Sequence, residues 1–413
     1  MFDHIANGDW LNRSRTRAIA LMLAAATIIL VLALFLTAKG TLDMFGRPLG
    51  TDFSNVWTAG RMALEGRAAL AWDWPSHHAI QVATHGDEAA KAFFAWLYPP
   101  PFLLVAMTLA LLPYGWALAV YQVATLIPAM WLARRIVPDR DTLLIAFAFP
   151  AVFVCFGHGH NGFLTASLLG GGMFLLDRRP FVAGLLIGCL IYKPQFGLVL
   201  PLVLLARTHI RAFSGACISA LILIGVTLLF WGWPVWQAFI DSLPQTQSII
   251  VEQGMTGWQK IQSAFSAARM WGASLPVAYA VQSAATLTAL AGALVATRLA
   301  APNVRNAVVI AASLLSTPYL LDYDLVVLGL AIAFLVADGR ARGFLRWEKS
   351  LYALAWATPL FGRAMTEATT IPLGLIATVA IFVLALRRAA ILDGAFARIR
   401  SWPFRRSHGA FVR

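Results

Sequence analysis

Long apolar runs separated by short polar stretches make up most of the chain. The first run, residues 18–38, is uninterrupted and follows Arg13, Arg15 and Arg17. It is long enough to cross roughly 30 Å of hydrocarbon. No small-residue cleavage pattern follows it, so we interpret it as a retained membrane span and not as a signal peptide.

The same pattern repeats along the chain and predicts an all-α polytopic membrane protein of about twelve spans. The runs that carry this prediction are residues 18–38, 100–112, 116–133, 142–156, 163–176, 181–205, 213–232, 276–298, 306–321, 323–337, 350–362 and 371–388.

The composition agrees with a membrane location. Sixty per cent of the 413 residues are hydrophobic and 12% are charged, whereas soluble domains have about 45–50% and about 25%. The three cysteines, Cys155, Cys189 and Cys217, all lie in apolar runs. They predict neither a disulfide framework nor a metal site.

The net charge of +13 comes from Arg and Lys at the ends of apolar runs. This placement is typical of membrane topology signals that face anionic lipid, so we expect contact with membrane lipids and none with nucleic acid. A cytoplasmic N-terminus and twelve spans return the basic tail, residues 389–413, to the cytoplasm. The same count leaves Arg134-Arg135 and Arg178-Arg179 outside. Positive residues favour the cytoplasm, so this placement needs an explanation. Either the 157–162 loop is external and a neighbouring segment is re-entrant, or local packing overrides the preference of positive residues for the cytoplasm.

Two long hydrophilic connections, residues 39–97 and 233–275, interrupt the apolar pattern. Both fall on the non-cytoplasmic side of the predicted topology, and we expect short surface helices in the first. Repeats and linkers are absent from the sequence. We therefore expect residues 1–413 to form a single integral membrane domain.

Charged residues are costly inside a membrane, so each exception marks a candidate site. Lys193 lies midway through an apolar run and is followed by Pro194, which breaks the helix. We expect this lysine to face an aqueous cavity and an anion; the alternatives are a pair with a neighbouring carboxylate or snorkelling along its aliphatic stem. Asp52, in the stretch GTDFSNVWTAG, follows the first span. Its bland explanation is a cap for a helix that begins near Ser54.

Three further stretches contain polar residues at the borders of apolar runs. GHGHN at 157–161 supplies His158, His160 and Asn161; we expect a hydrogen-bonding loop at a cavity mouth, because the HxH pattern has no third metal ligand at a suggestive spacing. STPYLLDYD at 316–324 contains Asp322 and Asp324. This DxD pattern is similar to a metal-binding pair but fits a helix N-cap equally well. WLYPPPF at 96–102 places Tyr98 before three prolines.

These stretches, in this order, resemble the membrane glycosyltransferases of the GT-C superfamily, and specifically glycosyltransferase family 87. That family includes polyprenol-phosphate-mannose-dependent α-1,2-mannosyltransferases. The matching text is TDFSNVWTAG, YPPPFLLVAMTLALLP, GHGHNGFL through AGLLIGCLIYKPQFGLVLPL, and STPYLLDYDLVVLGLA. The similarity covers most of residues 45–335 and implies a GT-C fold.

The resemblance implies roles for individual residues. Asp52 matches the aspartate that acts as general base, and Lys193 matches the intramembrane lysine whose charge stabilises the departing phosphate. The implied substrate-binding residues are Lys193, Tyr98, His158, His160, Asn161, Gln195, Tyr319, Asp322 and Asp324. Neither a metal nor a cofactor is implied. The chain departs from the family pattern in reading GHGHN where GQ-x-N is usual, and in lacking a histidine after the Ser-Pro break.

The resemblance implies an inverting glycosyltransferase of the bacterial inner membrane, with its active site facing the periplasm. It would move a sugar, mannose in the first instance, from a polyprenyl-phosphate donor to a lipid or glycan acceptor. The alternative is a polytopic transporter or flippase for an anionic lipid-linked substrate, since broken helices with an intramembrane lysine also form carrier sites. A non-catalytic scaffold is a third interpretation.

Overall fold

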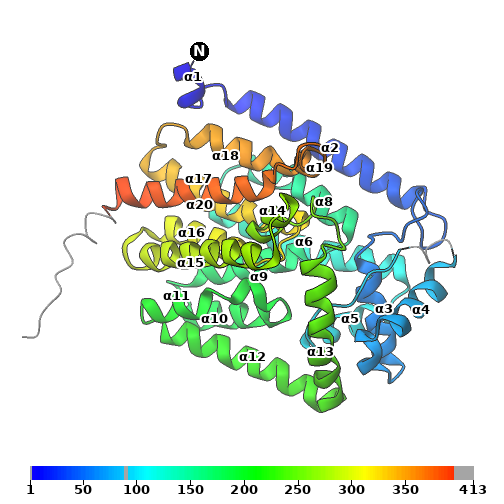
Figure 1. Ribbon diagram of the computed structural model, residues 1–413. Coiled ribbons are helices and arrows are strands. Elements are labelled where there is room, and N and C mark those ends of the chain that lie inside the picture. The colour runs from blue at the N-terminus through cyan, green and yellow to red at the C-terminus, as the bar shows by residue number, and fades with distance from the viewer. Residues whose placement is uncertain (1, 88–91, 395–413) are drawn as a thin grey trace, which may run out of the picture.

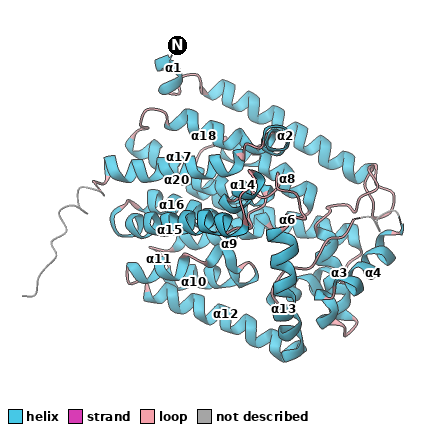
Figure 2. Cartoon of the chain, viewed as in Figure 1, coloured by secondary structure: helices cyan, strands magenta, loops and turns pink. Residues whose placement is uncertain are grey.

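The computed structural model describes residues 2–87 and 92–394, and these are helical apart from loops and isolated β-bridges (Figure 2). Within these described residues, five helices are long and apolar enough to cross a membrane. They are α2 (Arg13–Leu36), α6 (Tyr114–Ile136), α12 (Ile210–Trp231), α15 (Leu275–Leu299) and α20 (Leu373–Leu392). This arrangement fits a polytopic membrane protein; the count of about twelve spans stays a prediction.

Shorter helices complete the bundle and its loops. In the first connection lie α3 (Phe53–Leu64), η1 (Ala68–Trp72) and α4 (Trp74–His85); in the second lie α13 (Trp233–Thr246), η5 (Gln247–Glu252) and α14 (Ala264–Met270). The others are α1 (Phe2–Ala6), α5 (Pro101–Leu109), α7 (Thr142–Phe147), α8 (Pro150–His158), α9 (Gly162–Leu175), α10 (Pro180–Gly188), η3 (Cys189–Tyr192), η4 (Pro194–Gly197), α11 (Leu200–Ala206), α16 (Pro302–Leu315), η6 (Asp322–Leu325), α17 (Val326–Arg342), α18 (Glu348–Ala357), η7 (Thr358–Leu360) and α19 (Gly362–Thr369). In Figure 1, α13 runs across the direction of the long helices.

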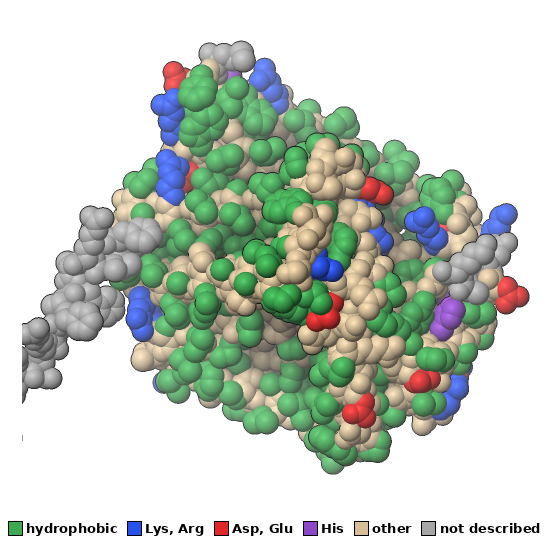
Figure 3. Space-filling view, viewed as in Figure 1, with side chains coloured by type: hydrophobic (Ala, Val, Ile, Leu, Met, Phe, Trp, Pro, Cys, Tyr) green, Lys and Arg blue, Asp and Glu red, His purple; other side chains and the backbone are tan. Residues whose placement is uncertain are grey.

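The centre of the bundle is α16. Every residue from Val304 to Leu315 is buried, and α15, α17 and α20 pack around the helix. By contrast, α2 and α12 expose many large apolar side chains, and apolar side chains cover much of the surface in Figure 3. A surface of this kind is stable in lipid, where exposed apolar groups carry no hydration cost.

The run at 181–205 is not one span, which corrects the sequence prediction. It consists of two arms, α10–η3 and η4–α11, that meet at Lys193, because Pro194 cannot continue the hydrogen-bond ladder. Arg207 donates to the carbonyl of Thr297, and Arg305 pairs with Asp177. Since Thr297 and Arg305 flank the same α15–α16 turn, both ends of the hairpin lie on one face, and the segment is re-entrant.

The span predicted at 100–112 is also absent. This run forms α5, a nine-residue helix that packs against α3 and is too short to cross a bilayer. The basic tail at 389–413 begins inside α20, and its residues from 395 onward lie outside the described residues. The short helices expected in the first connection are present as α3 and α4, but α3 is mostly buried against α5 and does not lie on the surface.

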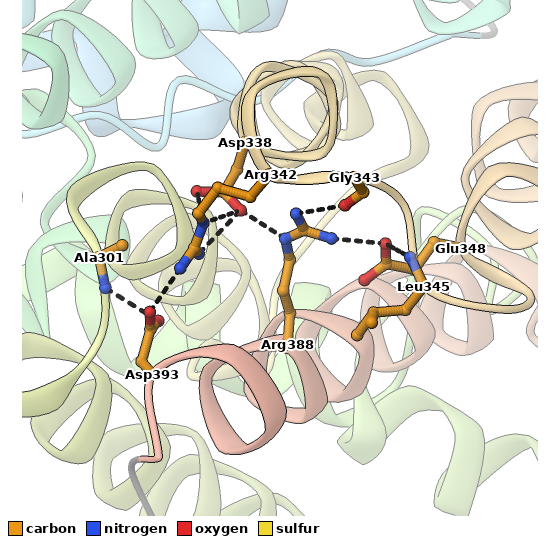
Figure 4. Close-up of polar contacts among 8 residues, drawn as sticks. All are labelled: Ala301, Asp338, Arg342, Gly343, Leu345, Glu348, Arg388 and Asp393. Atoms are coloured by element: carbon orange, nitrogen blue, oxygen red, sulfur yellow. Dashed lines mark hydrogen bonds and ion pairs between the residues drawn. The ribbon is translucent and has the colours of Figure 1, made fainter.

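Ion pairs gather the ends of the helices into one arginine-rich face, which we define by Arg13, Arg134, Arg135, Asp139, Asp177, Arg207, Arg298, Arg305, Arg340, Arg342 and Arg388. Asp139 binds both Arg13 and Arg340. Buried Arg388 binds Asp338 and Glu348, and Arg342 bridges Asp338 and Asp393 (Figure 4). Arg134-Arg135 and Arg178-Arg179 therefore lie on the same face as Arg13, and the re-entrant hairpin removes the conflict in the predicted topology.

The hairpin arm α10 packs on α12 through glycines, and one substitution tests this contact. A Cβ on Gly184 would lie 2.0 Å from the carbonyl oxygen of Ala212, so Gly184→Ala is expected to lower the free energy of unfolding by about 1–3 kcal/mol. The matched control is Gly225→Ala on α12, where a Cβ meets no atom within 4 Å. Thermal unfolding in detergent checks both. An equal melting temperature for the two variants would contradict the close packing.

Candidate functional site

Asp52 lies immediately before α3, which begins at Phe53. It occupies the N-cap position, yet its side chain accepts no capping hydrogen bond. Helix capping, the alternative considered from the sequence, is therefore not the role of the Asp52 carboxylate in this structure. Instead, Asp52 lines a cavity of about 440 Å³ on the side of the bundle away from the arginine-rich face.

The cavity brings together most of the residues singled out from the sequence. Asp52, Tyr98, His158, His160, Lys193, Gln195, Tyr319 and Asp324 all line it. Asp322 and Asn161 do not. Asn161 is buried, and its amide has no hydrogen-bond partner among the described residues. Both connections supply further walls: Phe93, Phe94 and Leu97 come from the first, and Phe239, Leu243 and Ile250 from the second make one side of the cavity apolar.

Lys193 is held by Asp324 in a buried ion pair with an Nζ–Oδ1 distance of 2.6 Å. The carboxylate also accepts from the backbone N–H of Leu321. The ion pair that the sequence left open as an alternative is thus present. Because Asp324 already neutralises Lys193, this lysine offers less positive charge to a ligand than its position suggested.

His158 connects two parts of the cavity rim. Arg363 donates from Nη2 to His158 Nε2 over 2.9 Å, while His158 Nδ1 lies 2.8 Å from Thr51 Oγ1. Since guanidinium only donates, His158 carries its proton on Nδ1 and donates it to Thr51. Arg363 also donates to Asp322 over 2.7 Å. This series of hydrogen bonds connects α19 and the 316–324 loop to Thr51, the residue before Asp52.

His160 lies deeper and is held by aromatic contacts. Its Nε2 lies 3.1 Å from the Tyr98 hydroxyl, and its ring stacks on Tyr323 with centroids 3.6 Å apart. Gln122 donates to its backbone carbonyl. The ring nitrogens of His160 and His158 therefore have different hydrogen-bond partners, which argues against an HxH metal site.

The carboxylates of the DxD stretch likewise diverge, because Asp322 binds Arg363 while Asp324 binds Lys193. Within residues 2–87 and 92–394, no group of three or more His, Cys, Asp or Glu side chains gathers as metal ligands. The alternative for the DxD stretch was helix capping. It applies to Asp324, whose side chain accepts a hydrogen bond from the backbone N–H of Leu321 at the start of η6.

Lys260 is a cavity residue that the sequence reasoning missed. It lines the same cavity as Asp52 and is positioned by an isolated bridge between Ile261 and Leu321, with Asp322 N–H donating to the Lys260 carbonyl over 3.0 Å. Its ammonium group makes no hydrogen bond or ion pair with the described residues. A lysine in a hydrophilic connection carries no signal in sequence, and only the pairing with the 316–324 loop brings it to the site.

The electrostatic state of Asp52 follows from this environment. Burial raises its pKa to about 6, against the hydrogen bond from Tyr323 and the charge of Lys260, which lower it. A carboxyl group with this pKa is mostly ionised at neutral pH and still basic enough to accept a proton. The cavity therefore combines a weakly solvated base with two lysines, Lys260 and the Asp324-paired Lys193.

Comparison with known proteins places this site in a family. The model of glycosyltransferase family 87 matches residues 96–321, which is more than half of the chain. The match includes Tyr98, His160, Lys193 and Lys260, whereas Asp52 precedes it. No curated protein and no solved structure matches the chain. The chain belongs to glycosyltransferase family 87 and is a membrane glycosyltransferase.

Proposed function

We propose that the protein transfers a sugar, mannose in the first instance, from a polyprenyl-phosphate donor to a lipid or glycan acceptor. The cavity faces the periplasm in this proposal, because the arginine-rich face lies at the other side of the bundle and positive residues favour the cytoplasm. The observation that carries it is the Asp52 carboxylate, which makes no capping bond and lines one cavity with Lys260.

The proposed reaction is a single displacement. The acceptor hydroxyl gives its proton to Asp52 as its oxygen forms a bond with the anomeric carbon, and the bond from that carbon to the phosphate oxygen breaks. The electron pair leaves with the polyprenyl phosphate. One base suffices and no second carboxylate is needed as nucleophile, so the configuration at the anomeric carbon inverts.

Lys260 is proposed to hold the departing phosphate. Of the two lysines that line the cavity, Lys193 is paired with Asp324, so Lys260 is the less compensated cation. A preorganised cation stabilises charge that develops on a leaving group in a poorly solvated site. The apolar wall formed by Phe239, Leu243 and Ile250 suits the isoprenoid chain.

Transfer by purified protein in lipid tests this function. Wild type receives radiolabelled polyprenyl-phosphate mannose, polyprenyl-phosphate glucose or a nucleotide sugar, together with envelope lipids as acceptors. Label is expected to move to acceptor from the mannose donor only. Transfer from the nucleotide sugar alone would overturn the lipid-linked donor, and transfer from the glucose donor alone would overturn mannose.

The pH dependence of transfer is expected to report on Asp52. Its pKa is raised to about 6, so the base is lost as pH falls through that value. Below pH 6, kcat/KM should fall about tenfold for each pH unit, and above pH 7 it should be flat with respect to this group. A profile of initial rates from pH 4.5 to 8 measures it. A flat profile down to pH 4.5 would contradict the assignment.

Removal of the Lys260 charge is expected to weaken transfer without unfolding the protein. Lys260→Ala should lower kcat/KM for the donor roughly a hundredfold, because one stabilising cation is lost from the leaving group. Lys260→Arg should retain most of the rate. Lys39→Ala, an exposed lysine of the first connection outside the cavity, is the control. Equal rates for Lys260→Ala and Lys39→Ala would exclude the phosphate role.

A further inference from the structure

A second cavity, of about 170 Å³, lies among α6, α7, α8, α9, α17 and α18. Apart from Asp139, Thr142 and Arg340, its lining is apolar or glycine. Met130, Ile145 and Ala333, which line it, are only half-buried. An apolar cavity of about 150 Å³ stays dry and accepts a molecule the size of benzene. This cavity is therefore large enough for a short hydrocarbon segment.

The polar end of the cavity belongs to the arginine-rich face. Asp139 and Arg340 form an ion pair there, and Arg13 joins them through the same carboxylate. The opposite end is formed by Val152, Phe163 and Val326. The cavity thus runs from a charged membrane border into the apolar interior, which matches the layout of a phospholipid.

Arg134 adds an unsatisfied donor beside this cavity. It follows the lining residue Met130 by four positions, so the two lie on one stripe of α6, and the lining residue Val137 follows directly after the helix end. Its Nη1 is buried and has no hydrogen-bond partner among the described residues. A buried guanidinium nitrogen of this kind is best satisfied by an anionic oxygen.

We propose that this cavity binds an anionic phospholipid from the leaflet that borders the arginine-rich face. One acyl chain enters among Met130, Ala333 and Trp356, and the headgroup phosphate contacts Arg134. The site requires only that the protein is embedded in a membrane, so it stands apart from the proposed sugar transfer. It is also distinct from the sugar site, whose charged residues Asp52, Lys193 and Lys260 do not line it.

Thermal unfolding of delipidated protein in detergent tests the proposal with two lipids of identical chains, phosphatidylglycerol and phosphatidylcholine. Phosphatidylglycerol is expected to raise the melting temperature of wild type by several degrees, because a ligand of the folded state stabilises it. Ala333→Phe fills the mouth of the cavity and Arg134→Gln removes the phosphate contact. Both variants should lose most of this shift.

Two matched controls separate the site from general lipid effects. Ala124→Phe adds the same ring to an exposed position of α6, and Arg135→Gln removes the neighbouring exposed charge; both should keep the wild-type shift. If Ala333→Phe showed the same rise in melting temperature as wild type, the proposed binding of an acyl chain in this cavity would be overturned. If phosphatidylcholine raised the melting temperature as much as phosphatidylglycerol does, the preference for an anionic headgroup would be overturned. Displacement of phosphatidylglycerol by polyprenyl phosphate would overturn the phospholipid as occupant.

Discussion

Replacing Asp52 with asparagine is expected to lower the rate of sugar transfer roughly a thousandfold while the fold is retained. General bases contribute about 10²–10⁴-fold to rate, and an amide cannot accept the proton of the acceptor hydroxyl. Asp52 makes no capping hydrogen bond, and burial raises its pKa because it disfavours the charged form. The neutral amide should therefore leave the melting temperature unchanged or slightly higher.

The measurement is transfer from radiolabelled polyprenyl-phosphate mannose at pH 7.5, with thermal unfolding of each variant beside it. Asp43→Asn is the control, because Asp43 lies in the same connection but outside the cavity. It should transfer like wild type. A rate for Asp52→Asn within threefold of wild type would discard the base while leaving the family assignment in place.

Breaking the Lys193–Asp324 pair is expected to cause the largest loss of stability. Both side chains are buried, 6% and 3% exposed, and their charged atoms lie 2.6 Å apart. Lys193→Met leaves the Asp324 carboxylate without its cation, and removing one partner of a buried pair costs about 3–5 kcal/mol. Unfolding in detergent measures this loss. A cost below 1 kcal/mol would mean that cavity water already solvates the pair.

The double variant Lys193→Met with Asp324→Leu distinguishes the pair from the packing around it. When both charges are replaced by apolar side chains, the desolvation cost disappears together with the attraction, and most of the lost stability should return. A double variant less stable than either single variant would show that the two residues act independently. Transfer activity is measured in parallel, since both residues line the cavity.

Several features of the site could be predicted because they depend on local sequence. Pro194 breaks its helix through its own missing N–H, and the break appears between η3 and η4. Asp52 precedes a helix within one residue of the expected start. The association of Asp52, His158, His160 and Lys193 in one cavity followed from resemblance to a family, and the structure brings the four together.

Other features depend on contacts between distant segments. Lys193 and Asp324 are 131 positions apart, and nothing in either apolar run specifies that they pair. Lys260 reaches the cavity through the bridge between Ile261 and Leu321. The apolar run at 181–205 was predicted as one span and is a re-entrant hairpin. Hydropathy records how apolar a segment is, but it does not record whether the two ends of the segment lie on the same face of the protein.

The sequence by itself determined that this is a membrane protein, because apolar content and run length set the solvent in which the chain is stable. It also determined where helices break and which family the chain resembles. Tertiary structure alone decided that the arginines flanking separate helices share one face, through pairs such as Arg305–Asp177 and Arg340–Asp139. It also decided which cations at the cavity are neutralised. The physical reason is that charge compensation is a property of distances in space, which the order of residues does not specify.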